Sequence, residues 1–136
     1  MELDFLQGTR KIMVATTAFG MGINVPDIEL VIHFNTPISM IDYIQQIGRG
    51  GRDEKIRAYC VLFYDHNGDD KQIIHSFIKM AAKKGEQAVE VLKANYAAMK
   101  SFLESGNCMV QDILAYQGQA EEKTCKGCTN CAKNRR

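Results

Sequence analysis

Short apolar runs divide the first half of the chain in a pattern typical of an α/β layer. Three runs, residues 12–15, 30–34 and 58–64, are rich in strand-forming side chains, and we predict a buried strand at each. Between the second and third runs, Ser39 is suited to cap a short helix over residues 40–45. This order of strand, helix and strand predicts part of a parallel sheet.

After residue 64 the pattern predicts only helices. A first helix is expected to start at Asp69 or Asp70 and to run through Met80. A second helix carries an apolar stripe at steps of three and four residues, formed by Val89, Leu92, Tyr96, Met99 and Leu103. Gly106 is suited to end this helix, and Asn107 is suited to cap a third helix that starts at the next residue.

The change of pattern predicts two domains, residues 1–64 and 65–136. A chain of 136 residues that is 46% hydrophobic and 24% charged has the composition of an ordinary globular protein with a real core. No apolar run approaches the ~18 residues that a membrane helix needs, and no secretion signal is recognisable, so we expect a cytoplasmic location and no membrane partner. A net charge of +1 means that any basic surface must be local.

Two arginines in the segment QQIGRGGRD, residues 45–53, are the first candidate for chemistry. Arg49 and Arg52 each follow a glycine, and they can present two planar cations beside one flexible backbone. Such a pair suits the transition state of a polyphosphate, whereas the alternative is a solvated basic loop. Upstream, the glycines of VATTAFGMGIN, residues 14–24, let backbone N–H groups approach a phosphate closely.

Four of the five cysteines form the second candidate, with the spacing C-x16-C-x2-C-x2-C: Cys108, Cys125, Cys128 and Cys131. Without a secretion signal, such clustering indicates a metal site before disulfides. Four thiolates satisfy the tetrahedral preference of Zn²⁺ and leave no open position for catalysis, so the zinc would be structural. An iron–sulfur cluster would use the same ligands, and four unrelated cysteines are the remaining alternative. Cys60 lies in an apolar run and is expected in the core.

The chain resembles the RecQ family of DNA helicases in three blocks, which follow one another along the sequence in the same order as in that family. Residues 14–24 are similar to helicase motif V in its RecQ form, residues 45–53 resemble motif VI, and the cysteines follow as in the RecQ zinc-binding subdomain. The resemblance covers nearly the whole chain. It implies the last half of a second RecA-like domain, with a partial parallel sheet, followed by a small helical zinc-binding lobe. The parent enzyme would couple ATP hydrolysis to 3′-to-5′ unwinding of DNA in repair and recombination.

The resemblance also implies roles for individual residues. Arg52 matches the arginine finger, Arg49 its companion facing the phosphates, and Gln45 the glutamine that couples the nucleotide site to motion. Positions expected beside ATP and its Mg²⁺ are the two arginines, Gly22, Asn24 and Gly48. Thr16 and Thr17 are expected against DNA, whose single strand and duplex junction the helicase engages. The ATP would be shared with a first RecA-like domain.

Several positions depart from the family pattern. The family usually has alanine at Gly50, lysine at Val25 after the motif V asparagine, and often arginine after the first zinc cysteine, where Met109 stands. Motifs I, Ia, II, III and IV, the winged helix and the C-terminal helical domain are absent, and no GxxxxGK[ST] loop occurs. We therefore expect this chain to show no ATPase activity by itself. A stand-alone zinc module that binds DNA or protein stays open, whereas half of a DEAD-box-like RNA helicase is disfavoured.

Overall fold

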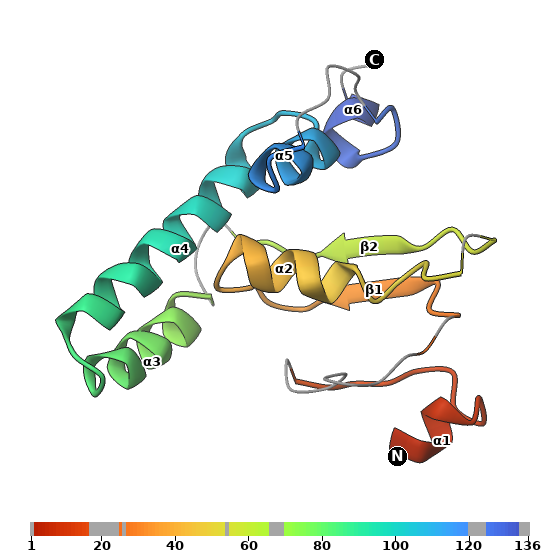
Figure 1. The fold of residues 1–136 in the computed structure, drawn as a ribbon, viewed down its shortest axis with the longest axis horizontal. Helices are drawn as coiled ribbons and strands as arrows, with labels where there is room; N and C mark the ends of the chain where they lie inside the picture. Colours follow the sequence, from red (N-terminus) through yellow and green to blue (C-terminus); the bar gives the residue numbers. More distant parts are fainter. Residues whose placement is uncertain are drawn as a thin grey trace. The chain divides into compact units, whose positions relative to one another are not determined.

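The computed structural model describes residues 2–16, 25, 27–53, 55–65, 70–119 and 125–133. Within these ranges the elements are α1 (Glu2–Leu6), β1 (Leu30–His33), α2 (Met40–Ile47), β2 (Tyr59–Leu62), α3 (Asp70–Ala82), α4 (Glu86–Glu104), α5 (Met109–Tyr116) and α6 (Thr129–Lys133) (Figure 1). The predicted α/β class, with a helical second half, is confirmed. Across the same ranges, no helix combines the length and the apolar character that crossing a membrane requires.

The two strands β1 and β2 pair in parallel. The N–H of Tyr59 donates to the C=O of Glu29 at 2.8 Å, and the N–H of Phe63 donates to the C=O of His33 at 3.0 Å. Both partners advance by four residues in the same direction, which defines a parallel register. Helix α2 lies between the strands in sequence, because parallel neighbours need a crossover connection rather than a tight turn.

The predicted strand at residues 12–15 does not form. This segment has no regular secondary structure, and the side chains of Ile12 and Val14 are 81% and 90% exposed. A buried strand needs a neighbour for its backbone groups and a layer of side chains over its faces. The described residues supply neither to this segment, so its apolar composition alone does not make it a strand.

Helix α2 starts where the sequence predicts. The Ser39 hydroxyl oxygen accepts a hydrogen bond from the backbone N–H of Asp42 at 3.1 Å and donates to its carboxylate at 2.6 Å. This cap satisfies a backbone donor that the first turn of a helix leaves without an intrahelical partner. Met40 and Tyr43, on the covered side of the helix, are buried.

The chain forms two compact units that interleave along the sequence, residues 1–31 with 46–61, and residues 32–45 with 62–136. The core of the second unit centres on Tyr43, whose ring lies 5.3 Å from that of His33 and 5.7 Å from that of Phe102. The domain boundary after residue 64 stays a prediction, because a division of the chain into compact units does not define its domains.

A buried carboxylate fixes the start of α3 in this second unit. Asp70 accepts hydrogen bonds from the hydroxyl of Thr36 at 2.5 Å, the backbone N–H of Thr36 at 3.3 Å and the side-chain amide of Asn35 at 3.4 Å. Three donors offset the cost of removing a carboxylate from water. The loop that follows β1 is thereby tied to the first turn of α3.

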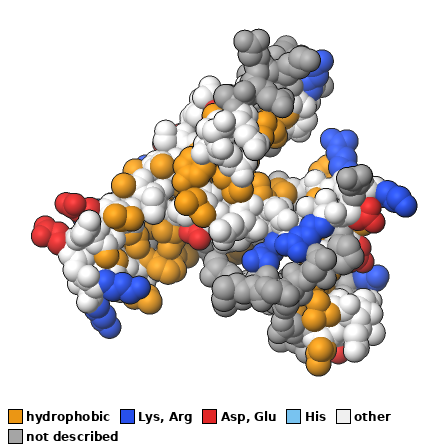
Figure 2. All heavy atoms as spheres, viewed as in Figure 1, with side chains coloured by type: hydrophobic (Ala, Val, Ile, Leu, Met, Phe, Trp, Pro, Cys, Tyr) orange, Lys and Arg blue, Asp and Glu red, His pale blue; other side chains and the backbone are white. Residues whose placement is uncertain are grey.

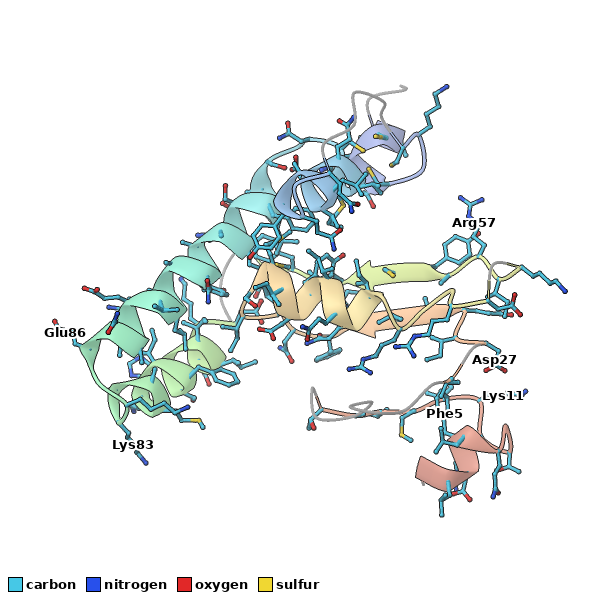
Figure 3. All side chains as sticks on the ribbon, in the orientation of Figure 1. Phe5, Lys11, Asp27, Arg57, Lys83 and Glu86 are labelled. Atoms are coloured by element: carbon cyan, nitrogen blue, oxygen red, sulfur yellow. The ribbon has the colours of Figure 1, made fainter. Side chains whose placement is uncertain are left out.

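The α3–α4 hairpin contains Met99, the largest fully buried side chain among the residues that the structure describes. Figure 2 shows hydrophobic side chains gathered over this hairpin, with lysine and acidic side chains at its turn, where Lys83 and Glu86 are labelled in Figure 3. Met99 of the predicted stripe is 0% exposed, and Phe102 is 6% exposed. Met99 therefore packs in the core, and the other four residues of the stripe are half-buried.

We expect Met99→Ala to lower the free energy of unfolding by about 2–5 kcal/mol, because it removes buried methylene groups and leaves a cavity. Met80 is 62% exposed, so Met80→Ala, an identical chemical change, should alter stability by no more than about 0.5 kcal/mol. Urea unfolding followed by helical circular dichroism measures both. Equal effects of the two substitutions would show that Met99 does not pack as described.

Candidate metal centre and arginine loop

The four predicted cysteine ligands lie together. The Sγ atoms of Cys108, Cys125, Cys128 and Cys131 all lie within 4.8 Å of one another. Cys108 is the N-cap residue of α5, and Cys131 lies on α6. Cys60 is exposed on β2, so its predicted place in the core is wrong: its strand neighbours Tyr59 and Val61 are exposed as well, so the described residues bury neither face of the strand there.

Backbone N–H groups surround the sulfur atoms. The N–H groups of Cys128 and Gly127 point to the Cys125 sulfur at 3.2 and 3.4 Å. The N–H of Cys125 points to the Cys108 sulfur at 3.4 Å, and that of Cys131 to the Cys128 sulfur at 3.5 Å. Donors aimed at sulfur favour the thiolate over the thiol. The local backbone is therefore arranged to hold negative sulfur before any cation is considered.

The pKa values of Cys128 and Cys131 reflect the crowding of the sulfur atoms. Burial raises the pKa of Cys128, but hydrogen bonds, the first from the N–H of Cys131, outweigh it and lower the pKa to about 6. Burial and the neighbouring cysteine sulfurs raise the pKa of Cys131 to about 12. Thiolates this close repel each other, so one ionises at the expense of the next. A divalent cation relieves that repulsion, and the four-sulfur donor set fits the tetrahedral preference of Zn²⁺.

Polar contacts behind the cysteines join α4, α5 and α6. The side-chain amide of Asn130 donates to the C=O of Asn107 at 2.8 Å, and the Ser105 hydroxyl donates to Asp112 at 2.9 Å. The roles of Asn130 and Ser105 as supports were not predicted. A signal in the sequence for Asn130 is its position between Cys128 and Cys131. Asn107 was expected to cap α5, and this is wrong by one residue, because Cys108 has the extended backbone of the N-cap.

The two arginines of the first candidate, Arg49 and Arg52, share one short loop after α2. The N–H groups of Arg49 and Gly50 donate to carbonyls of the last turn of α2 at 3.3 and 3.1 Å, so the loop begins as a tight continuation of the helix. Gly51 then adopts a positive φ of 66°, which glycine tolerates best. The Arg52 guanidinium is exposed and donates through Nε to the C=O of Gly48 at 3.4 Å.

The glycine at position 50 has a packing reason. A Cβ atom at Gly50 would lie 2.9 Å from the Cβ of Ala58 and 3.3 Å from a methyl group of Val31. Neither atom is the end of a long side chain, so neither can move aside easily. The departure from the family alanine is therefore matched by a methyl group at position 58, which fills the same space.

We expect Gly50→Ala to lower the free energy of unfolding by about 1–3 kcal/mol through overpacking. The double variant Gly50→Ala/Ala58→Gly should recover most of the space, although glycine near a strand costs about 0.5–1 kcal/mol. Chemical denaturation of the two single variants and the double variant completes the cycle. Strictly additive effects would show that the two positions do not compete for one space.

The remaining site predictions are only partly described. Gln45 is exposed on α2, and Thr16 is exposed at the end of its segment. Thr17, Gly22 and Asn24 lie outside the described residues. The structure therefore groups the four cysteines in one cluster and the two arginines in one loop, and the roles assigned to all these residues stay predictions.

The chain carries a parallel strand–helix–strand unit, with the arginine loop between its helix and its second strand, and a cysteine-rich helical lobe follows. Family comparisons assign these two parts to a helicase motor end and a metal-binding lobe. Residues 1–54 match the family described as the helicase conserved C-terminal domain. Residues 68–132 match the family described as RecQ zinc-binding. The cysteine cluster lies within the second match, and the arginine loop lies at the end of the first.

Individual relatives include proteins named as RecQ DNA helicases. A protein named ATP-dependent DNA helicase RecQ from Pasteurella multocida is 35% identical over 93% of this chain and 19% of its own length. Its namesake from Bacillus subtilis is 33% identical over 96% of this chain and 21% of its own length. A protein of Acanthamoeba polyphaga mimivirus, whose name provisionally assigns it as an ATP-dependent RNA helicase, is 37% identical over 94% of this chain and 22% of its own length.

The chain belongs to the RecQ helicase family. It spans about a fifth of the length of the curated relatives it matches.

Proposed function

We propose that this chain supplies the arginine loop and a zinc-stabilised lobe to an ATP-dependent DNA helicase that unwinds DNA from 3′ to 5′. The observation that carries the proposal is the four-cysteine cluster downstream of the arginine loop, inside a segment that matches the RecQ zinc-binding family. The relatives named as DNA helicases support DNA as the partner. Repair and recombination are the processes in which such an enzyme would act.

In this proposal the arginine loop acts on the phosphates of ATP. Arg52 supplies a planar cation that stabilises charge on the transferred phosphoryl group, and Arg49 supports it from three residues away. Gln45, on the helix before the loop, links the nucleotide to motion. The backbone near Gly48, Gly22 and Asn24 lies beside the nucleotide, whose Mg²⁺ and phosphates are held mainly by a first RecA-like domain.

The zinc lobe has a structural role in the proposal. Zn²⁺ held by Cys108, Cys125, Cys128 and Cys131 would tie the N-cap of α5 to α6 and to the loop between them. Four sulfur ligands complete the tetrahedron, so the metal binds neither water nor substrate. Thr16 and Thr17 are assigned to the backbone of the single strand.

A chimera tests the proposal. The matching segment of the Bacillus subtilis relative is replaced by this chain, and DNA-stimulated ATP hydrolysis and unwinding of a 3′-tailed duplex are measured. We expect both activities to persist, because the graft restores the arginine loop and the zinc lobe together. A folded, zinc-loaded chimera without either activity would contradict the proposal and would favour the stand-alone zinc module.

The chain by itself is expected to show no ATP hydrolysis above the buffer background. It lacks the GxxxxGK[ST] loop whose backbone cradles the phosphates. Release of inorganic phosphate is measured with and without single-stranded DNA, and the Arg52→Ala variant serves as the control for contaminating ATPases. Turnover that disappears in this variant would reveal a nucleotide site that the proposal does not contain.

A further inference from the structure

The segment from Lys71 to Gly85, which covers helix α3 after its first residue and the three residues that follow it, carries charge of one sign only. Residues 71–85 contain four lysines and no aspartate or glutamate, in a chain whose net charge is +1. The lysines are Lys71, Lys79, Lys83 and Lys84. The one acid of α3, Asp70, is buried and already accepts three hydrogen bonds. The metal site and the arginine loop do not involve this surface.

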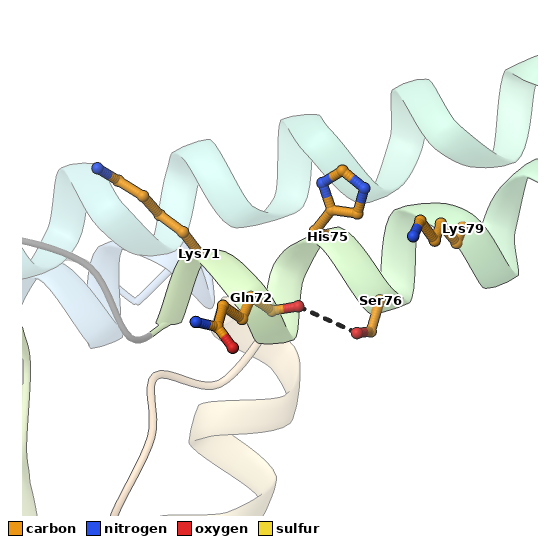
Figure 4. A pocket seen from close by; sticks show the side chains of 5 residues that line it. All are labelled: Lys71, Gln72, His75, Ser76 and Lys79. Atoms are coloured by element: carbon orange, nitrogen blue, oxygen red, sulfur yellow. Dashed lines mark hydrogen bonds between the residues drawn. The ribbon is translucent and has the colours of Figure 1, made fainter.

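Five side chains on α3 form a row, which we call the α3 row: Lys71, Gln72, His75, Ser76 and Lys79. All five are exposed, and they line a shallow open hollow of about 410 Å³ (Figure 4). Lys71, His75 and Lys79 recur every four residues, so they lie on one face of the helix and rise about 6 Å per step. The buried residues of α3, Asp70 and Ala81, lie on the other side of the helix.

The lysines of the α3 row have no acidic partner in the part of the chain that the structure describes. Within the described ranges, ion pairs join Arg10 to Asp4 and Lys100 to Glu104, and neither pair involves the α3 row. Lys71 and Lys79 therefore present their ammonium groups to solvent. His75, Gln72 and Ser76 add polar groups between them, and Ser76 keeps its acceptor oxygen while its hydroxyl donates to the C=O of Gln72 at 3.0 Å.

We propose that the α3 row binds the phosphodiester backbone of DNA, as a contact separate from the threonines assigned to motif V. The inference rests on the proposed function, because that function makes DNA the partner. A straight row of cations and amide donors suits a polymer with regularly repeated phosphates. The row contains no Phe, Tyr or Trp. Because its cations would contact phosphates, which are the same at every nucleotide, binding is expected to be independent of base sequence.

The test is direct binding of the whole 136-residue chain, zinc-loaded, to a fluorescent single-stranded oligonucleotide across a range of salt concentrations. The double variant Lys71→Gln/Lys79→Gln removes two charges from the row. A matched control, Lys93→Gln/Lys133→Gln, removes two exposed charges from α4 and α6. Circular dichroism and zinc content establish that each variant is folded.

We expect the row variant to bind about tenfold more weakly at low salt, because two phosphate contacts are lost. Its slope of log affinity against log salt should fall by about 1.4, which is about 0.7 for each single-strand phosphate contact. The control variant should keep the wild-type slope and lose less than about twofold in affinity.

Four results would overturn the inference. Equal losses in both double variants would mean that only net charge matters. A wild-type chain that binds no oligonucleotide would leave the row without its ligand. Lysine-dependent binding to vesicles of anionic lipid, without binding to DNA, would assign the row to a membrane surface. If the chimera unwinds DNA and the row variant of the chain binds DNA normally, the inference is rejected and the proposed function stands. If the chimera is inactive and DNA binding by the chain depends on the row, the proposed function is rejected and the inference stands.

Discussion

Cys128→Ser is expected to abolish zinc binding by the chain and to unfold the part of the lobe built from α5 and α6. Those helices are short, eight and five residues, and no side chain of either is buried. The metal must therefore supply most of the free energy that orders them, and structural zinc contributes about 10–16 kcal/mol in small zinc-binding peptides. The α3–α4 hairpin has its own core around Met99 and should keep its helices.

Cys60→Ser is the matched control, since it makes the same atomic change at a cysteine outside the cluster. It should leave zinc content and stability close to those of the wild type. Elemental analysis of purified protein measures the metal, and helical circular dichroism with limited proteolysis follows the fold. Retention of one zinc per chain by Cys128→Ser, with unchanged proteolysis, would contradict the assigned ligand set.

Arg52→Ala is expected to reduce DNA-stimulated ATP turnover by about 10³–10⁵ in a helicase that carries this segment. Affinity for DNA should stay within a few-fold, because Arg52 is assigned to the nucleotide and not to the strand. Removing its cation leaves the developing phosphoryl charge without its partner, which affects the transition state more than the ground state.

Arg57→Ala provides the control for the arginine loop. Arg57 is an exposed arginine five positions further on, and its guanidinium lies 5.6 Å from the centre of the Tyr59 ring instead of in the loop. Steady-state ATPase rates of both variants in the chimeric enzyme make the comparison. Unchanged turnover in Arg52→Ala, or an equal loss in Arg57→Ala, would reject the finger assignment.

The elements that depend on local chemistry could be predicted from the sequence. Ser39 caps α2 through a hydrogen bond to a backbone N–H three residues on, and such caps depend on neighbours in the chain. The apolar stripe of α4 repeats with the helical period, so the burial of Met99 could be predicted as well. Gly106 ends α4 with a positive φ of 69°, the conformation in which glycine is favoured after a helix.

Features that depend on distant partners could not be predicted. Residues 12–15 have the composition of a strand, but a strand also requires a paired neighbour. The Cβ of Ala58 occupies the space that a Cβ at position 50 would need, although the two positions are eight residues apart. The hydrogen bond between Thr36 and Asp70 joins positions that are 34 residues apart. Nothing in a linear pattern specifies such pairs. The cysteine cluster was an exception, because metal ligands reveal themselves by type and spacing.

The central claim is that four cysteines hold one structural zinc in a RecQ-type lobe, and zinc K-edge X-ray absorption of the purified chain tests it most directly. The predicted result is one zinc with four sulfur neighbours at about 2.3 Å and no nitrogen or oxygen ligand. Iron in place of zinc, or a zinc shell that contains nitrogen or oxygen, would contradict it.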